Sequence, residues 1–332
     1  MKIIVDGMGG DKGYKEVVKG CVDATKQLDV GIVIVGQEEK IKEELSKHEY
    51  SQNRIEILNA EEVIFNDEEP ALAIRRKKNS SIVVGLKALS ENRGDGFVSA
   101  GSTGALLAGG LFIVKRIEGI ERAAIATVYP TLKGVSLLID AGANVDCKPE
   151  YLLQFAIMGS IYCEKVLGKI SPKVGLVNIG TEEGKGNSLV KEAYKLIKES
   201  NLNFIGNIEA RDIPNGVADV IVSDGFAGNI ILKLTEGMAM SIFSRLKEEI
   251  NKSYKSKIGA LMLKHQLKSF VKLMDYREYG GAPLLGLKKP VVKAHGSSDS
   301  LAITNAIKQV KNFIDNGVIN LIEEDINKIT RI

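Results

Sequence analysis

The sequence predicts an α/β protein built on a doubly wound, mostly parallel sheet, and three features support this fold class. Short apolar runs at residues 2–6, 31–35 and 54–58 alternate with longer segments that have helical periodicity. Several such runs end at a glycine-bearing loop, and glycine makes up 34 of the 332 residues. Only a short turn separates the runs at 123–129 and 134–140, which predicts an antiparallel hairpin within the sheet.

The composition favours a large globular enzyme and excludes nucleic acid as the main partner. The chain is 44% hydrophobic, and its 45 lysines and arginines are interspersed with 42 acids rather than gathered in tracts. With no tryptophan and 5% aromatic residues, little is left to build a base-stacking surface. We expect one catalytic unit over residues 1–332, either as a single body or as two lobes around a central cleft.

Cysteine usage and apolar patterning predict a cytoplasmic protein. Cys21, Cys147 and Cys163 have neither close pairing nor metal-type spacing, as expected in a reducing compartment. The N-terminus enters a strand without a signal-peptide pattern, and no apolar run reaches the length of a membrane span.

Residues 95–114 predict a strand, a glycine turn and a buried helix, and this unit is a candidate anion site. Its turn consists of Gly101, Ser102, Thr103 and Gly104. Glycine allows close approach of the backbone to a ligand, and the free amides at a helix N-terminus attract an anion. The alternative is an ordinary tight turn with its helix packed closely on the sheet.

Four more glycine loops follow predicted strands, at 7–13, at Gly142, at 180–186 and at 225–228. Because the carboxyl ends of parallel strands share one edge, we expect all five loops to converge on one crevice. The loop at 180–186 is not a P-loop, because Gly186 follows Lys185 where a Ser or Thr is required.

Familiar catalytic signatures are missing from the sequence. It contains no GxGxxG dinucleotide fingerprint, no GxSxG elbow and no HExxH zinc pair. An enzyme rich in amide cradles but without a nucleophile of its own is suited to a reaction in which one substrate is an anionic nucleophile. Inorganic phosphate meets that description.

Several polar side chains have more than one interpretation. Asp6 and Asp11 can bind a substrate hydroxyl, orient a basic group or cap the following helix, and the structural role is favoured for Asp11. His295 follows a strand beside an amide-rich turn, where chemistry and a structural hydrogen bond are equally plausible. The basic cluster at 75–78 fits phosphate groups, an acidic protein or a solvated helix face.

Residues 253–276 alternate apolar side chains with lysines, which predicts a protruding amphipathic helical insertion. Packing on the core, contact with a second subunit and reversible binding to a membrane surface are all compatible with this pattern. The residues expected to contact a membrane or partner are Leu261, Leu263, Leu267 and Phe270. The segment 279–286 is predicted to be a turn with a local apolar cluster.

Long motifs spread over the chain resemble those of the bacterial phosphate acyltransferase family, PlsX. They include SAGSTGALLAGG at 99–110, AGANVDCKPE at 141–150, NIGTEEGKGN at 178–187 and DGFAGN at 224–229. The similarity runs almost from end to end. Gly7, Ser102 and Ala141 depart from the Ala, Asn and Val expected from the family.

The resemblance implies transfer of a fatty acyl group from acyl carrier protein to inorganic phosphate, forming acyl phosphate for phospholipid synthesis. It also implies an isocitrate/isopropylmalate dehydrogenase-like fold shared with phosphotransacetylases, a homodimer and peripheral association with the membrane. We expect no cofactor and no metal. The alternative activity is that of a phosphate acetyl- or butyryltransferase that uses acyl-CoA.

The resemblance suggests direct attack of bound phosphate on the thioester carbonyl. The amides of Gly101 to Gly104 and Lys185 would hold phosphate, Asn144 or Asn229 would stabilise the oxyanion, and His295 or Lys185 would assist the leaving thiolate. The candidates for binding phosphate or substrate are Asp6, Gly9, Gly10, Asp11, Ser99, Gly101, Ser102, Thr103, Gly104, Gly180, Thr181, Arg211, Asp224 and Gly225.

Overall fold

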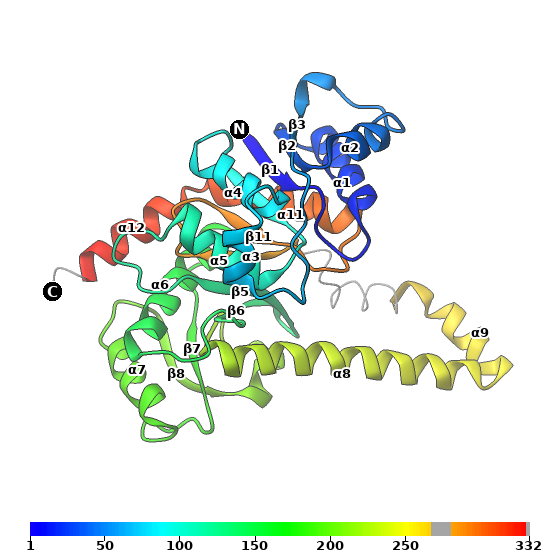
Figure 1. Ribbon diagram of the computed structural model, residues 1–332. Coiled ribbons are helices and arrows are strands. Elements are labelled where there is room, and N and C mark those ends of the chain that lie inside the picture. The colour runs from blue at the N-terminus through cyan, green and yellow to red at the C-terminus, as the bar shows by residue number, and fades with distance from the viewer. Residues whose placement is uncertain (267–279, 330–332) are drawn as a thin grey trace.

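One 11-stranded sheet runs through the protein, whose computed structural model describes residues 1–266 and 280–329 (Figure 1). The strand order is β3-β2-β1-β4-β11-β10-β5-β6-β9-β7-β8. The strands are β1 (Lys2–Asp6), β2 (Gly31–Gly36), β3 (Ile55–Asn59), β4 (Gly96–Ser99), β5 (Ala124–Thr131), β6 (Gly134–Ile139), β7 (Val174–Asn178), β8 (Phe204–Glu209), β9 (Val220–Val222), β10 (Ala282–Leu285) and β11 (Val291–Lys293).

The sheet consists of two parallel halves that run in opposite directions. Strands β3, β2, β1, β4 and β11 are parallel to one another, and so are β6, β9, β7 and β8. Between the halves, β10 is antiparallel to both β11 and β5, and β5 is antiparallel to β6. The predicted mostly parallel sheet and the predicted β5–β6 hairpin are therefore confirmed.

The expectation that all carboxyl ends lie at one edge is wrong, because the central antiparallel strands reverse the direction of the second half. The twist of the sheet partly restores the convergence. With roughly 20–25° of rotation per strand, β6 is turned by about 90° relative to β4, four places away in the sheet. The ends of the two halves can therefore face a shared cleft without sharing an edge.

Helices cover both faces of the sheet, because its strands present apolar side chains on both sides. In the first half, Ile3 and Val5 pack with α1 and α11, whereas Ile4 packs with α4. In the second half, Leu137 packs with α6, whereas Leu138 belongs to the core beside the first turns of α8. The helices are α1 (Tyr14–Gln27), α2 (Glu38–Leu45), α3 (Pro70–Arg76), α4 (Ser81–Ser90), α5 (Thr103–Gly109), α6 (Pro149–Lys165), α7 (Ser188–Lys198), α8 (Gly225–Asn251), α9 (Tyr254–Met262), α11 (Ser300–Asp315) and α12 (Val318–Ile329).

The long helix α8 leaves the body of the protein and carries α9 at its far end (Figure 1). Its 27 residues span about 40 Å. The hydroxyls of Tyr129 and Thr235 are 2.8 Å apart and attach the first turns of α8 to β5. None of the α9 residues is buried, so the interpretation of this segment as a helix packed on the core is wrong for its described part.

Two of the predicted contact residues in this segment, Leu267 and Phe270, lie outside the described residues, whereas Leu261 and Leu263 are exposed. Within residues 1–266 and 280–329, no helix combines the length and the hydrophobicity needed to cross a bilayer.

Of the turn predicted over residues 279–286, residue 279 lies outside the described residues, and the rest of the prediction is wrong because β10 is a strand in the middle of the sheet. The misleading features are Gly280, Gly281 and Pro283, which are typical of turns. Pro283 lacks an amide hydrogen and is rarely found in a central strand, yet it pairs with Val292 here. Neighbouring strands on both sides determine this conformation, and their positions are not visible in the local sequence.

Candidate active site

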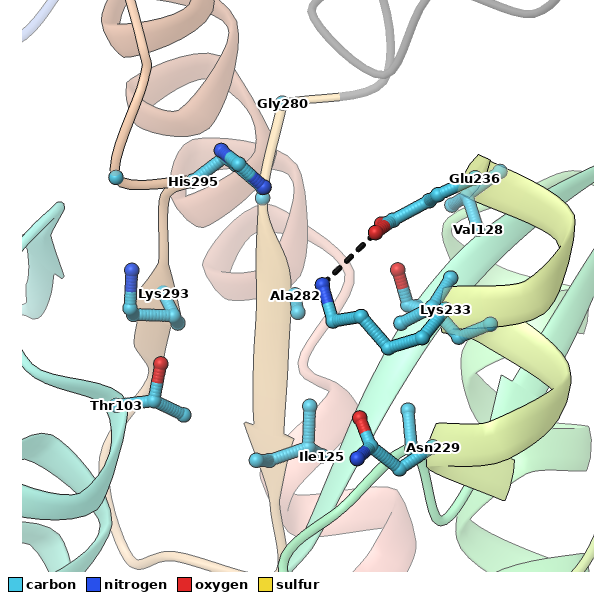
Figure 2. A pocket seen from close by; sticks show the side chains of 15 residues that line it. Thr103, Ile125, Val128, Asn229, Lys233, Glu236, Gly280, Ala282, Lys293 and His295 are labelled. Atoms are coloured by element: carbon cyan, nitrogen blue, oxygen red, sulfur yellow. Dashed lines mark hydrogen bonds and ion pairs between the residues drawn. The ribbon is translucent and has the colours of Figure 1, made fainter. Parts of the chain in front are cut away.

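A cavity of about 240 Å³ lies between the two halves of the sheet, and both halves line it (Figure 2). Ile125 and Val128 of β5 and Leu232 of α8 form an apolar wall. The polar side chains that line the cavity are Thr103, Thr127, Asn229, Lys233, Glu236, Lys293 and His295. An apolar wall beside two cations fits a ligand that has an anionic part and a hydrocarbon part.

On the side of the first sheet half, the loops after β1, β4 and β11 pack directly on one another. A Cβ atom on Gly9 would lie 2.5 Å from the Gly101 nitrogen, so a larger residue would push these two loops apart. The Asp11 amide donates to the Gly296 carbonyl at 2.7 Å. The predicted convergence of the loops at 7–13 and 101–104 is therefore confirmed, and the loop that carries His295 joins them.

Asp6 holds these loops in place. Its carboxylate is buried and accepts hydrogen bonds from Ser99 Oγ at 2.6 Å and from the Met8 amide at 3.1 Å. Ser99 Oγ in turn accepts from the Gly101 amide at 3.0 Å. Burial raises the pKa of Asp6, and these hydrogen bonds oppose the rise. This geometry supports a role that was not among those expected for Asp6, the positioning of the glycine turn.

Ser102 and Asp11 both lie near the start of a helix, but only Ser102 caps one. Ser102 is the N-cap of α5 and accepts from the Ala105 amide at 3.4 Å. Capping of α1 by Asp11 is wrong, because Gly13 holds the N-cap position and makes no side-chain hydrogen bond there. Asp11 instead joins two loops through its backbone amide.

Two more glycines of this side lie at close contacts. Gly10 has a φ of +96°, and a Cβ atom there would lie 3.2 Å from the Gly296 carbonyl oxygen. A Cβ atom on Gly104 would lie 2.6 Å from the ring of Pro70 at the start of α3. Because neither glycine has a side chain, the loop that carries Gly296 and the start of α3 can pack closely against the loops of Gly10 and Gly104.

Lys293 is a functional candidate that the sequence interpretation missed. It lies on β11 among the residues that line the cavity, and Figure 2 shows its side chain beside Thr103. Its ammonium donates to the Ala294 carbonyl and, at 3.4 Å, to the Ala100 carbonyl. Burial lowers its pKa to about 8, while Asp6 and Asp11 act in the opposite direction. A lysine in the otherwise apolar strand VVKA was the available signal.

His295 lines the cavity and is exposed on its other side. Partial burial lowers its pKa, while the charge of Glu236 acts in the opposite direction. Its Nδ1 lies 2.9 Å from Ser297 Oγ and 3.2 Å from the Ser297 amide. In the tautomer that accepts the Ser297 amide hydrogen at Nδ1, His295 can donate one hydrogen bond from Nε2.

Helix α8 supplies the opposite side of the cavity. Its N-cap is Asp224, which accepts from the Ala227 amide at 2.8 Å. Asn229, Lys233 and Glu236 follow at i, i+4 and i+7 and so share one helix face. The Lys233 ammonium lies 2.8 Å from the Glu236 carboxylate, as the dashed line in Figure 2 marks. The sequence interpretation missed both charged residues, although their spacing from Asn229 was visible.

The loop after β6 meets the start of α8 and separates the two asparagine candidates. Asp140 is buried, and burial raises its pKa, while the amides of Ile125, Gly142, Ala143 and Asn144 donate hydrogen bonds to its carboxylate. The Asn144 side-chain nitrogen donates to Asp140 at 2.9 Å and to the Ala123 carbonyl at 2.8 Å. Both of its hydrogens are thus engaged, whereas Asn229 lines the cavity.

Gly225 is needed for this contact between loops. Its amide donates to the Asn144 carbonyl at 2.7 Å, and a Cβ atom there would lie 2.7 Å from the same oxygen. Gly142 has a φ of +134°, and a Cβ atom there would lie 3.5 Å from Asn229. The predicted loops at Gly142 and 225–228 therefore lie together beside the cavity.

Of the predicted catalytic and phosphate-binding residues, Thr103, Asn229 and His295 line the cavity itself, and the loop at 180–186 does not, so the expected convergence of all five loops is wrong for this one. Lys185 is exposed and its ammonium lies 4.0 Å from Glu182, while Gly180 and Thr181 belong to the same loop. The Arg211 guanidinium is exposed and lies 2.5 Å from Glu209. Their proposed contacts with phosphate or substrate stay predictions.

Comparison with known proteins identifies the family. A family model described as "Fatty acid synthesis protein" matches residues 1–321. A phosphate acyltransferase from Alkaliphilus oremlandii is 57% identical over 329 residues, covering 99% of this chain and 98% of the relative. The chain belongs to the phosphate acyltransferase family.

Other comparisons agree with membership of the phosphate acyltransferase family, whose members are acyltransferase enzymes. A phosphate acyltransferase from Clostridium tetani is 54% identical over 330 residues, covering 99% of each chain. A phosphotransacetylase structure from Streptococcus pyogenes matches with a TM-score of 0.64 at 20% identity, covering 95% of this chain and 94% of that one. The predicted kinship with phosphotransacetylases is confirmed at the level of the fold.

Proposed function

We propose that the protein transfers a fatty acyl group from acyl carrier protein to inorganic phosphate and so supplies acyl phosphate for phospholipid synthesis. The observation that carries this proposal is the half-buried ammonium of Lys293 in a cavity that also has an apolar wall. Membership of the phosphate acyltransferase family supports the same reaction class. The cation suits phosphate, and the wall suits an acyl chain.

In the proposed reaction, a phosphate oxygen attacks the thioester carbonyl carbon while phosphate is held by Lys293, Thr103 and the amides at the start of α5. Charge develops on the carbonyl oxygen, where Asn229 and the Nε2 hydrogen of His295 can donate hydrogen bonds. The carbon–sulfur bond then breaks, acyl phosphate forms, and the thiolate takes a proton to become the free thiol. The proton that hydrogen phosphate loses on acylation restores the proton donor, so no net proton is taken up. Lys293 holds a proton of suitable acidity, because its pKa of about 8 lies near that of a thiol.

The test compares donors at saturating phosphate. Acyl phosphate should form from long-chain acyl carrier protein with a kcat/KM well above that for short-chain acyl-CoA. Exclusive use of short acyl-CoA would instead assign the protein as a phosphate acetyl- or butyryltransferase. No phosphate-dependent loss of either thioester would refute the proposed reaction altogether.

We propose in addition that α8 pairs with a second copy of the chain. Six of its seven large exposed apolar residues recur at every fourth position, and the seventh, Met240, lies off this row. The six are Phe226, Ile230, Leu234, Met238, Ile242 and Leu246. An i, i+4 row is the ridge that packs into a groove of another helix. Sedimentation should show a dimer that Leu234→Glu/Met238→Glu converts to a monomer, whereas a dimer unchanged by these substitutions would refute this interface.

Peripheral membrane association through α9 and the residues after it is a separate proposal. Leu261 and Leu263 are exposed, and Lys255, Lys257 and Lys264 lie close to them in the sequence. The protein should float with anionic liposomes, and Leu261→Glu/Leu263→Glu should reduce that flotation. Lys195→Glu on α7, a substitution far away in the sequence, serves as the control and should leave it unchanged.

A further inference from the structure

A basic and apolar surface on α3 lies near the cavity and has no part in the proposed reaction. This surface, which we call the α3 patch, consists of Phe65, Leu72, Arg75, Arg76, Lys78 and Phe112. The three apolar residues are large and exposed, with Phe65 at 62%, Leu72 at 42% and Phe112 at 54%. Exposed aromatic residues beside arginine are typical of protein–protein interfaces.

Cations lie over both aromatic rings of this region. The Arg75 guanidinium carbon is 5.5 Å from the centre of the Phe112 ring, which joins α3 to the turn after α5. The Lys77 ammonium is 5.4 Å from the centre of the Phe65 ring. These contacts hold the two rings at the surface beside positive charge.

Two of the acidic residues that precede α3 are already engaged. Glu68 lies 2.7 Å from the Lys77 ammonium, and Glu69 accepts hydrogen bonds from the amides of Ala71 and Leu72 at the start of α3. Arg76 and Lys78, by contrast, are exposed and have no ion pair among the described residues. Glu61 and Asp67, earlier in the same segment, are exposed and likewise have no ion pair among the described residues. The positive charge available to a partner is therefore confined to the end of α3, at Arg76 and Lys78.

The α3 patch lies within reach of the cavity. Pro70, the first residue of α3, packs against Gly104, which is next to the cavity-lining Thr103. Helix α3 extends from there for seven residues, so Arg76 lies about 9 Å further along its axis. A protein docked at the far end of α3 can extend a flexible thioester arm to the cavity.

We propose that the α3 patch docks the acidic surface of the carrier protein that delivers the acyl thioester. This inference rests on the proposed function and names the surface that recognises the donor. Charge complementarity favours an acidic protein, and three large apolar side chains favour a folded partner over a free phosphate group, which needs cations alone. The partner contributes acidic side chains to Arg76 and Lys78 and an apolar contact to Phe112.

The test compares two donors, the acyl carrier protein and acyl-pantetheine, which offers the thioester without the protein. Arg76→Glu/Lys78→Glu should lower kcat/KM for acyl carrier protein by about tenfold or more, because like charges now face each other. With acyl-pantetheine as donor, the same variant should stay within about twofold of the unchanged protein, because the docking surface is not used. Fluorescence anisotropy of labelled apo-carrier should show a matching rise in Kd.

The matched control is Lys191→Glu/Lys195→Glu, which makes the same charge change on exposed residues of α7. It should behave as the unchanged protein with both donors, and thermal melting should show that both variants fold. An unchanged kcat/KM and Kd for the carrier in the α3 variant would overturn the docking site alone. Failure of the unchanged protein to use acyl carrier protein would instead refute the proposed function.

Discussion

The two sides of the cavity differ in how firmly their polar groups are held. On the side of β1, β4 and β11, Asp6 is buried and Lys293 is half-buried, and both are bonded to side chains or to backbone carbonyls. On the side of α8, the side chains of Lys233 and Glu236 are 58% and 40% exposed and are paired with each other. In the proposed reaction the first wall would thus offer a fixed site for phosphate, whereas the second could adjust to an arriving substrate.

Lys293→Met should have the largest effect, because it removes the preorganised cation. We expect kcat/KM in the acyl transfer assay to fall by about 10²–10³-fold, as for the loss of one donor from an oxyanion site. The companion variant Lys185→Met should cost about tenfold, mostly through KM for phosphate, because that lysine is exposed. A larger loss of kcat/KM in Lys185→Met than in Lys293→Met would place the phosphate site at the loop that carries Lys185 instead of in the cavity.

The two asparagines should separate catalysis from stability. Asn229→Ala should lower kcat by about 10²-fold with little change in unfolding temperature, because its side chain lines the cavity. Asn144→Ala should lower the unfolding free energy by about 1–3 kcal/mol, because it breaks two hydrogen bonds, one of them to a buried carboxylate. The reverse outcome would exchange the roles of the two residues.

The pH dependence tests the buried cation directly. Lys293 has a pKa lowered to about 8, so it is charged below that pH and loses its proton above it. KM calculated for the phosphate dianion should therefore be constant below about pH 8 and rise by up to tenfold per pH unit above it. Lys293→Arg keeps the charge at high pH, so its KM should stay level there, and an unchanged rise in this variant would assign the titration to another group.

Glu236→Gln should have the smallest effect. The exposed pair with Lys233 contributes about 0–1 kcal/mol, so the unfolding free energy should change by less than that. We expect kcat/KM to change by no more than about threefold, because Lys233 retains its charge. A loss comparable to that of Lys293→Met would show that the α8 side is as preorganised as the opposite side.

Local patterns in the sequence were sufficient to predict most of the strands and helices and some residues of the site. Buried runs followed by glycine predicted β1, β4 and β6 and their loops, because burial on both faces and close backbone contacts leave clear residue preferences. The spacing from Asn229 to Lys233 and Glu236 was also visible. Its importance follows only from the position of α8, which brings these three residues to the cavity.

The sequence by itself determined the alternation of strands and helices, the glycine loops and the family. Only the tertiary structure decided that β10 lies between β11 and β5, that Lys293 lines the cavity and that the hydrogens of Asn144 are already engaged. The physical reason is that strand direction, burial and hydrogen-bond partners depend on residues distant in the chain. A local sequence pattern records which side chains are present but not which of them meet.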